Sequence, residues 1–148
     1  MRDILFRGKR KDNGEWIEGY YAKATEAISD KEVHVIFPLD LTLFPRNEFC
    51  SYVEIIPGTN YQFTGLTDKN GKKIFEGDAV KAKVIVNKMS GSKKYDDIYE
   101  VAYHPNYCYF YLKKKGNNLL FDGNWSYGVT IEEVIGNIHD NPELLEDE

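Results

Sequence analysis

The sequence predicts a mainly β fold, built from short antiparallel strands and hairpins with only minor short helices. Tyrosine and phenylalanine favour strands, and aromatic residues make up 14% of the 148 residues, with eleven tyrosines. Asn-Gly pairs, which are typical of tight hairpin turns, stand between apolar runs at Asn13-Gly14 and Asn70-Gly71. Apolar and charged residues alternate over 79–86, which indicates a strand with one buried face.

The N-terminal part reads as a β-rich subdomain over residues 1–60. Segments 4–7 and 16–21 are predicted to form a hairpin in which Asn13 and Gly14 both take a positive φ. Residues 22–32 are predicted to form a short helical turn or a polar loop. Strands are expected at 33–37 and 52–56, and the prolines between them predict irregular structure.

A second subdomain is predicted over 61–148. Its expected strands are 61–66, 74–75, 79–86, 98–104, 107–112 and 134–138. A flexible loop is expected from Asn87 to Asp97. A helical turn is expected at 130–134, where Thr130 and Glu133 match a capping box, and a short helix after Asn141-Pro142. Short strands at this spacing suit a small, partly open SH3-like barrel, with the N-terminal β unit packed on it.

Charge and composition exclude several classes of protein. The net charge is −5, and the acidic C-terminus accounts for most of it. No apolar run approaches the roughly 18 residues of a membrane span and no signal peptide is visible, so a cytoplasmic protein without a membrane partner is expected. Cys50 and Cys108 have no ligand partner nearby and are interpreted as small core residues. The three histidines are widely separated, so neither a metal nor a cofactor is predicted.

Glycine, aspartate and asparagine residues in the second subdomain mark turns with a structural role. Glycines tolerate a positive φ, and Asp or Asn side chains accept backbone N–H bonds in turns. Asn137, next to Gly136, is expected to form a hydrogen bond across the sheet. The predicted turn residues are Gly65, Asp68, Asn70, Gly71, Gly77, Asp78, Gly136 and Asn137.

Three segments together resemble a known family. They are an opening segment (4–9 with 15–20), a central one (62–78, Gln-Phe-Thr-Gly-Leu-Thr-Asp-Lys-Asn-Gly-Lys-Lys-Ile-Phe-Glu-Gly-Asp) and a closing one (134–145). In this order they resemble the YopX family, small proteins of bacteriophages and prophages. The resemblance implies a β-rich fold and a phage origin. It implies no activity and no catalytic residue.

Six of the eleven tyrosines fall within 79–115, together with eight lysines. Alternation places Tyr107, Tyr109 and Tyr111 on one strand face, near Lys113, Lys114 and Lys115, while Cys108, Phe110 and Leu112 face the core. An exposed row of rings is a binding surface for a protein or for stacked bases. The first hypothesis is therefore a non-enzymatic phage accessory protein that binds a phage or host protein or forms a homo-oligomer. Single-stranded nucleic-acid binding is the alternative, and an enzyme is not predicted.

Overall fold

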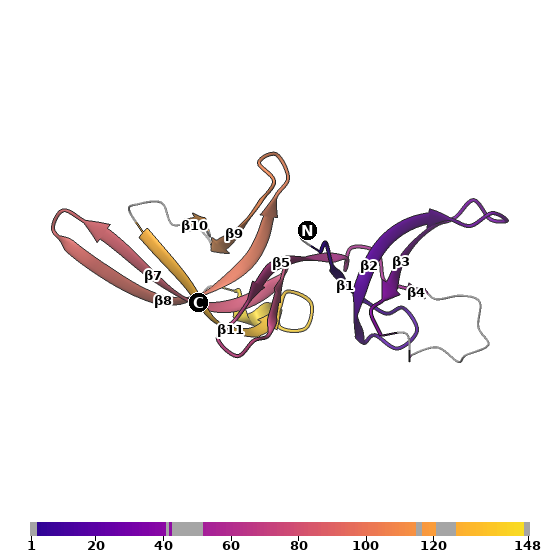
Figure 1. The fold of residues 1–148 in the computed structure, drawn as a ribbon, viewed down its shortest axis with the longest axis horizontal. Helices are drawn as coiled ribbons and strands as arrows, with labels where there is room; N and C mark the ends of the chain where they lie inside the picture. The colour runs from indigo at the N-terminus through magenta and orange to yellow at the C-terminus, as the bar shows by residue number, and fades with distance from the viewer. Residues whose placement is uncertain (1–2, 41, 43–51, 115–116, 121–126, 147–148) are drawn as a thin grey trace. The chain divides into compact units, whose positions relative to one another are not determined.

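The computed structural model describes residues 3–40, 42, 52–114, 117–120 and 127–146 (Figure 1). The chain divides into two compact units, Met1–Phe63 and Thr64–Glu148. Most of the described residues lie in strands, and the only helix longer than a single residue among them is a 3₁₀ helix at Pro142–Leu144. The mainly β class predicted from the sequence is confirmed.

The first unit holds five antiparallel strands in the order β4-β3-β2-β1-β5. Their bounds are β1 Phe6–Lys9, β2 Trp16–Thr25, β3 Glu32–Pro38, β4 Val53–Glu54 and β5 Tyr61–Thr67. β5 continues past Phe63 into the second unit, where β6 is its neighbour in the sheet. Ile17, Ile36 and Ile55 form the core of the first unit, with Phe6 and Tyr21 packed against them.

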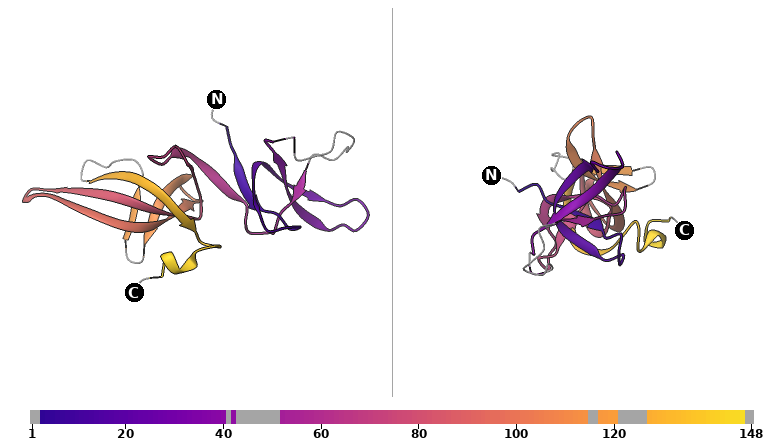
Figure 2. Two further views of the ribbon diagram at one scale, coloured as in Figure 1. Left: turned by 90° about the horizontal axis from the view of Figure 1, so that it is seen from below. Right: turned by 90° about the vertical axis from the view of Figure 1, so that its right-hand side faces the viewer.

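The second unit contains β6 and a five-stranded antiparallel sheet in the order β10-β9-β8-β7-β11 (Figures 1 and 2). The bounds are β6 Lys73–Phe75, β7 Asp78–Lys88, β8 Gly91–His104, β9 Tyr109–Lys114, β10 Asn117–Leu120 and β11 Tyr127–Asn137. Neither sheet closes into a barrel over the described residues. The SH3-like likeness stays a prediction.

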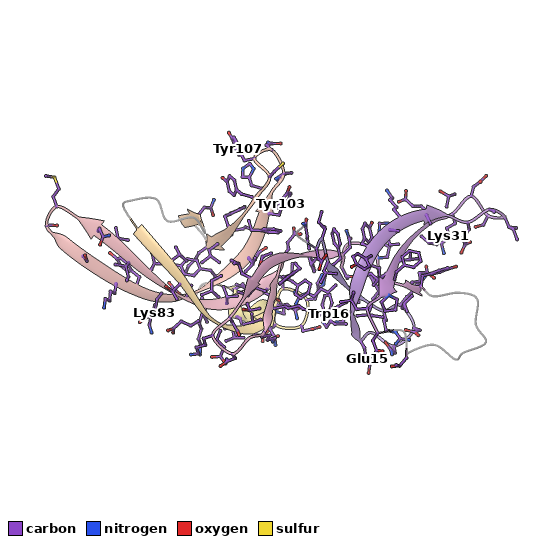
Figure 3. All side chains as sticks on the ribbon, viewed as in Figure 1. Glu15, Trp16, Lys31, Lys83, Tyr103 and Tyr107 are labelled. Carbon is purple, nitrogen blue, oxygen red and sulfur yellow. The ribbon has the colours of Figure 1, made fainter. Side chains whose placement is uncertain are left out.

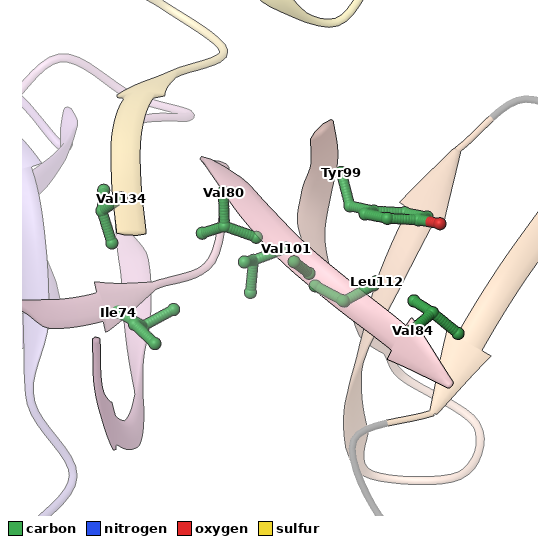
Figure 4. Close-up of a cluster of buried hydrophobic side chains, with 8 residues drawn as sticks. Ile74, Val80, Val84, Tyr99, Val101, Leu112 and Val134 are labelled. Carbon is green, nitrogen blue, oxygen red and sulfur yellow. The ribbon is translucent and has the colours of Figure 1, made fainter. Parts of the chain in front are cut away.

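Alternating apolar residues of the sheet supply the core of the second unit. Val80, Ala82 and Val84 on β7 are buried as their period-two spacing predicts, and Val86 is half-buried. Figure 4 shows Val80 and Val84 close to side chains from other strands, among them Tyr99, Val101, Leu112 and Val134. Because β7 pairs with β8 on one side and β11 on the other, residues 54 apart in sequence, such as Val80 and Val134, meet in this cluster.

Several local predictions are wrong. The stretch 130–134 lies inside β11 and not in a helix, because Ile131 and Val134 pack into the sheet core and tertiary packing overrides the capping-box pattern. Asn87 to Asp97 is not a flexible loop: β7 and β8 extend through it and leave only Met89 and Ser90 between them. In 22–32, the predicted turn or polar loop is confined to residues 26–31, because β2 continues to Thr25 and β3 begins at Glu32.

Two further predictions fail at turns. Between β1 and β2 only Gly14 takes a positive φ (73°), and Asn13 does not, so the hairpin uses a longer turn that closes with Arg10 N donating to Glu15 O at 2.8 Å. Cys108 is not a core residue: it is exposed and stands in the β8–β9 turn with a φ of 55°. Cys50 lies outside the described residues.

Candidate functional site: an aromatic cluster on the second sheet

The predicted tyrosines lie together at the end of the β8–β9 hairpin. The ring centroids of Tyr107 and Tyr109 are 6.0 Å apart with planes only 16° from parallel, and those of Tyr109 and Tyr111 are 6.2 Å apart in an edge-on arrangement. Tyr107 is 70% exposed and Tyr109 36%, whereas Tyr111 is half-buried. Figure 3 shows Tyr107 at the tip of this hairpin. The exposure of the rings therefore increases from Tyr111, in the sheet, to Tyr107, at the hairpin tip.

A histidine that the sequence did not indicate stands beside all three tyrosines. The ring of His104 lies 4.8 Å from Tyr107, 5.5 Å from Tyr109 and 6.1 Å from Tyr111 between centroids. Its Nδ1 is buried and makes no hydrogen bond to the described residues. His104 joins the row because it is opposite Tyr109 in the β8–β9 register, a pairing that spacing along the chain does not reveal.

The turn between the two strands gives Tyr107 its exposed position. The backbone N–H groups of Tyr107 and Cys108 both donate to His104 O, at 3.3 and 2.9 Å. Cys108 closes the turn in the left-handed region, which residues other than glycine rarely adopt. On the opposite face, the rings of Tyr103 and Phe110 are 5.1 Å apart and brace the two strands. We name His104, Tyr107, Tyr109 and Tyr111 the aromatic cluster.

The lysines beside the aromatic cluster have carboxylate partners. Lys113 Nζ lies 3.1 Å from Glu100 Oε2 across the β8–β9 pair, and Lys114 forms an ion pair with Asp97. The pKa of Asp97 lies below its usual value: burial opposes this shift most strongly, but the hydrogen bonds from Lys114 and from Ile98 N, together with the charge of Lys114, outweigh it. Lys115 lies outside the described residues. The positive charge predicted next to the tyrosines is therefore partly neutralised.

The turn residues of the central segment fix the backbone of the second unit. Asp68 Oδ1 accepts from the N–H groups of Asn70 and Lys72, both at 2.9 Å, and its Oδ2 accepts from Val134 N at 3.0 Å. These bonds, led by that from Val134, hold the pKa of the Asp68 carboxyl below its usual value. One side chain thus joins the β5–β6 turn to β11, which lies 66 residues further along the chain.

A second carboxylate holds the backbone of the next turn through a local hydrogen bond. Asp78 is fully buried, and its Oδ2 accepts from Phe75 N at 2.8 Å. Its backbone pairs with Asn137 of β11, and Ile138 N donates to Gly77 O at 2.9 Å. The central and closing segments of the sequence therefore meet in space.

The remaining turn residues fit this framework. Gly65, Gly71 and Gly77 have φ values of 88°, 79° and 76°. Gly136 has no room for a side chain, since a Cβ there would lie 2.5 Å from Asn141 Oδ1. The backbone of Asn137 pairs across the sheet with Asp78, whereas its side chain bonds locally. Its Oδ1 accepts from the N–H groups of His139 and Asp140, both at 3.0 Å, and closes a local turn.

Neither a metal-binding cluster nor a membrane-spanning helix is present among the described residues. Among them, no group of three or more His, Cys, Asp and Glu side chains is placed to hold a metal ion. No helix in the described part of the chain is long and apolar enough to cross a membrane.

Comparison with known proteins identifies the family. The family model for the YopX protein matches residues 5–146, nearly the whole chain. The chain belongs to the YopX family. This family has no assigned enzymatic activity.

No curated protein matches. Among solved structures, the chain is similar to protein EF1440 from Enterococcus faecalis, at 26% identity and a TM-score of 0.49, with 99% of this chain and 100% of the other covered.

Proposed function

We propose that this YopX chain is a non-enzymatic, protein-binding β module, an accessory protein of phage or prophage origin that acts in the bacterial cytoplasm. The observation that carries the proposal is the aromatic cluster, in which Tyr107 and Tyr109 stack in parallel at an exposed hairpin tip. Tyrosine is enriched at protein interfaces because its rigid ring buries much apolar area while its hydroxyl group stays hydrogen-bonded.

The geometry favours a protein partner over a nucleic acid. Stacked tyrosines can also accommodate bases, but a nucleic-acid surface needs free cations along the backbone path. Here Lys113 and Lys114 are each in an ion pair with a carboxylate of β8. Protein contact does not require these charges, since the rings themselves supply the buried area.

The proposal is tested by comparing three forms of the full chain as affinity baits. The double variant Tyr107→Ser with Tyr109→Ser removes the exposed rings. Tyr95→Ser is the matched control, because Tyr95 is also exposed (46%) but lies elsewhere on β8. We expect proteins from the bacterial host that bind the wild type and the control but not the double variant, and purified partners that bind with little salt dependence. Equal capture by all three baits contradicts the proposal.

Binding of a fluorescent single-stranded oligonucleotide tests the alternative, that the aromatic cluster binds nucleic acid. The measurement compares the full chain with a form lacking residues 143–148, whose acidic side chains oppose nucleic acid. We expect no binding at about 50 mM salt, where phosphate contacts are strong. Binding that falls steeply with salt and is lost in the Tyr107→Ser, Tyr109→Ser variant would instead assign the cluster to nucleic acid.

A further inference from the structure

The β2–β3 ribbon of the first unit carries apolar side chains on both of its faces. One face contributes Ile17 and Ile36 to the core. The other face holds Ala22 opposite Val35 and Ala24 opposite Val33. An antiparallel sheet that buries one face ordinarily has polar residues on the other. Val35 on this second face is buried, but Ala24 and the neighbouring Phe37 are exposed, so the described residues leave part of the apolar face uncovered.

This second face forms a groove of about 480 Å³. Ala22, Ala24, Val33 and Val35 line it. Phe37 and Tyr52 also line it, with ring centroids 6.1 Å apart in an edge-on arrangement. Both rings are more than 40% exposed, so they could cover further apolar surface.

The tip of the same ribbon carries an isoleucine with no cover of its own. Ile28 is fully exposed, although it stands at the end of the groove. It lies between Glu26 and Lys31, whose backbones are joined by a 2.9 Å hydrogen bond from Glu26 N to Lys31 O. Figure 3 shows Lys31 at this end of the hairpin. The same ribbon therefore carries an apolar groove and an exposed apolar side chain, Ile28, which we call the knob.

We propose that the groove receives Ile28 of a second copy of this chain, in a two-fold symmetric contact between two β2–β3 hairpins. In such a contact each copy supplies the same patch, so a ribbon that carries both the knob and the groove is complementary to itself. Each Ile28 then leaves water and enters the partner copy's groove between Ala24 and Phe37. This surface lies in the first unit and is separate from the aromatic cluster of the second.

The charges of the hairpin fit a second copy. Glu26 and Lys31 have opposite signs on either side of the knob, so two-fold symmetry allows Glu26 of each copy to face Lys31 of the other. Lys23 and Glu32 neutralise one another within the ribbon, with Nζ and Oε2 2.8 Å apart. The only other charge between residues 22 and 35 is Asp30, and two hairpins therefore approach with little repulsion.

The contact is tested by sedimentation equilibrium of the full chain at concentrations of about 1–300 µM. This range covers dissociation constants of about 10⁻⁶–10⁻⁴ M, which are expected for a weak specific dimer. Ile28→Asp puts a charge on the knob and should fold normally, since the Ile28 side chain is fully exposed. We expect a dimer for the wild type and association weakened by at least about 100-fold for Ile28→Asp. Met89→Asp is the matched control, because Met89 is an equally exposed apolar residue at the β7–β8 hairpin tip. It should dimerise as the wild type does.

Exchanging the charges of Glu26 and Lys31 tests the proposed pairing of these two residues between the copies. Glu26→Lys and Lys31→Glu should each weaken the dimer, and the double exchange should restore most of the loss. The variant Tyr107→Ser, Tyr109→Ser should leave dimerisation unchanged. A wild-type chain that stays monomeric at the highest concentration overturns the proposal. So does a dimer that Ile28→Asp leaves intact, or one that Met89→Asp weakens equally.

Discussion

The two carboxylate turns and the aromatic cluster occupy the same unit but are built in opposite ways. At Asp68 and Asp78, buried carboxylates accept backbone N–H groups, from the distant Val134 in the first case and from Phe75 of the same turn in the second. In the aromatic cluster, rings pack on one another at the surface, and Nδ1 of His104 is left without a bond to the described residues. The first region is suited to holding the chain in place, because any loosening leaves buried polar groups unpaired. The second is suited to presenting area to a partner.

If this contrast holds, Asp78→Ala should produce the largest loss of stability. The substitution leaves Phe75 N without its acceptor in a fully buried place and creates a small cavity. We expect the free energy of unfolding to fall by about 3 kcal/mol, measured by urea denaturation. Asp78→Asn is the control: it keeps the volume and one acceptor oxygen and should cost clearly less. Similar losses in both variants would show that charge, and not the acceptor, matters.

Acid should weaken the same region through Asp68. Its carboxyl has a lowered pKa in the folded chain, whereas in the unfolded chain it titrates near its usual value of about 4. The stability it contributes is therefore present above about pH 4 and is lost as the pH falls through the folded pKa. Urea midpoints between pH 2 and 7 should drop at the acid end for the wild type. Asp68→Asn should be weaker at pH 7 but show a flatter profile, and an unchanged slope would contradict this assignment.

Substitutions at left-handed turn positions should change the free energy of unfolding in opposite directions in the two regions. Gly71 suits its φ of 79°, so Gly71→Ala should destabilise by about 1 kcal/mol, while Gly71→Asn should cost less. Cys108 holds a similar φ of 55° without being a glycine, so Cys108→Gly should stabilise by up to about 1 kcal/mol. Thermal unfolding of each variant measures both effects. Destabilisation by Cys108→Gly would show that this side chain is needed for the turn.

The smallest change in stability is expected at the tip of the aromatic cluster. Tyr107 is largely exposed, so Tyr107→Ser should alter the free energy of unfolding by less than about 0.5 kcal/mol. Tyr111→Ser, deeper in the same row, should cost more because that ring is half-buried. Denaturation of the two single variants gives the comparison. A Tyr107→Ser loss as large as that of Tyr111→Ser would mean that the row serves the fold and not a partner.

Local chemistry accounts for much that was predicted correctly. The alternation of Val80, Ala82 and Val84 sets which face of β7 is buried, because side chains in a strand point to opposite faces in turn. The glycine at position 71 predicts a positive φ for the same local reason. The tyrosines come together because two of them are alternate residues of β9 and the third stands in the turn just before it.

Tertiary structure decided the features that depend on residues far apart in the sequence. Residues 130–134 form a strand because β7 offers them a pairing edge, which outweighs a local helix signal. Asp68 gains its third bond from Val134, and His104 joins the tyrosines through strand register. Cys108 is exposed because β9 begins at Tyr109, two residues later than predicted, which leaves Cys108 in the turn. The sequence alone determined the mainly β class, the buried face of β7 and the turn glycines, since these depend on neighbouring residues. Register, edge pairing and the surfaces left uncovered depend on which strands meet, and that is settled only when the whole chain packs.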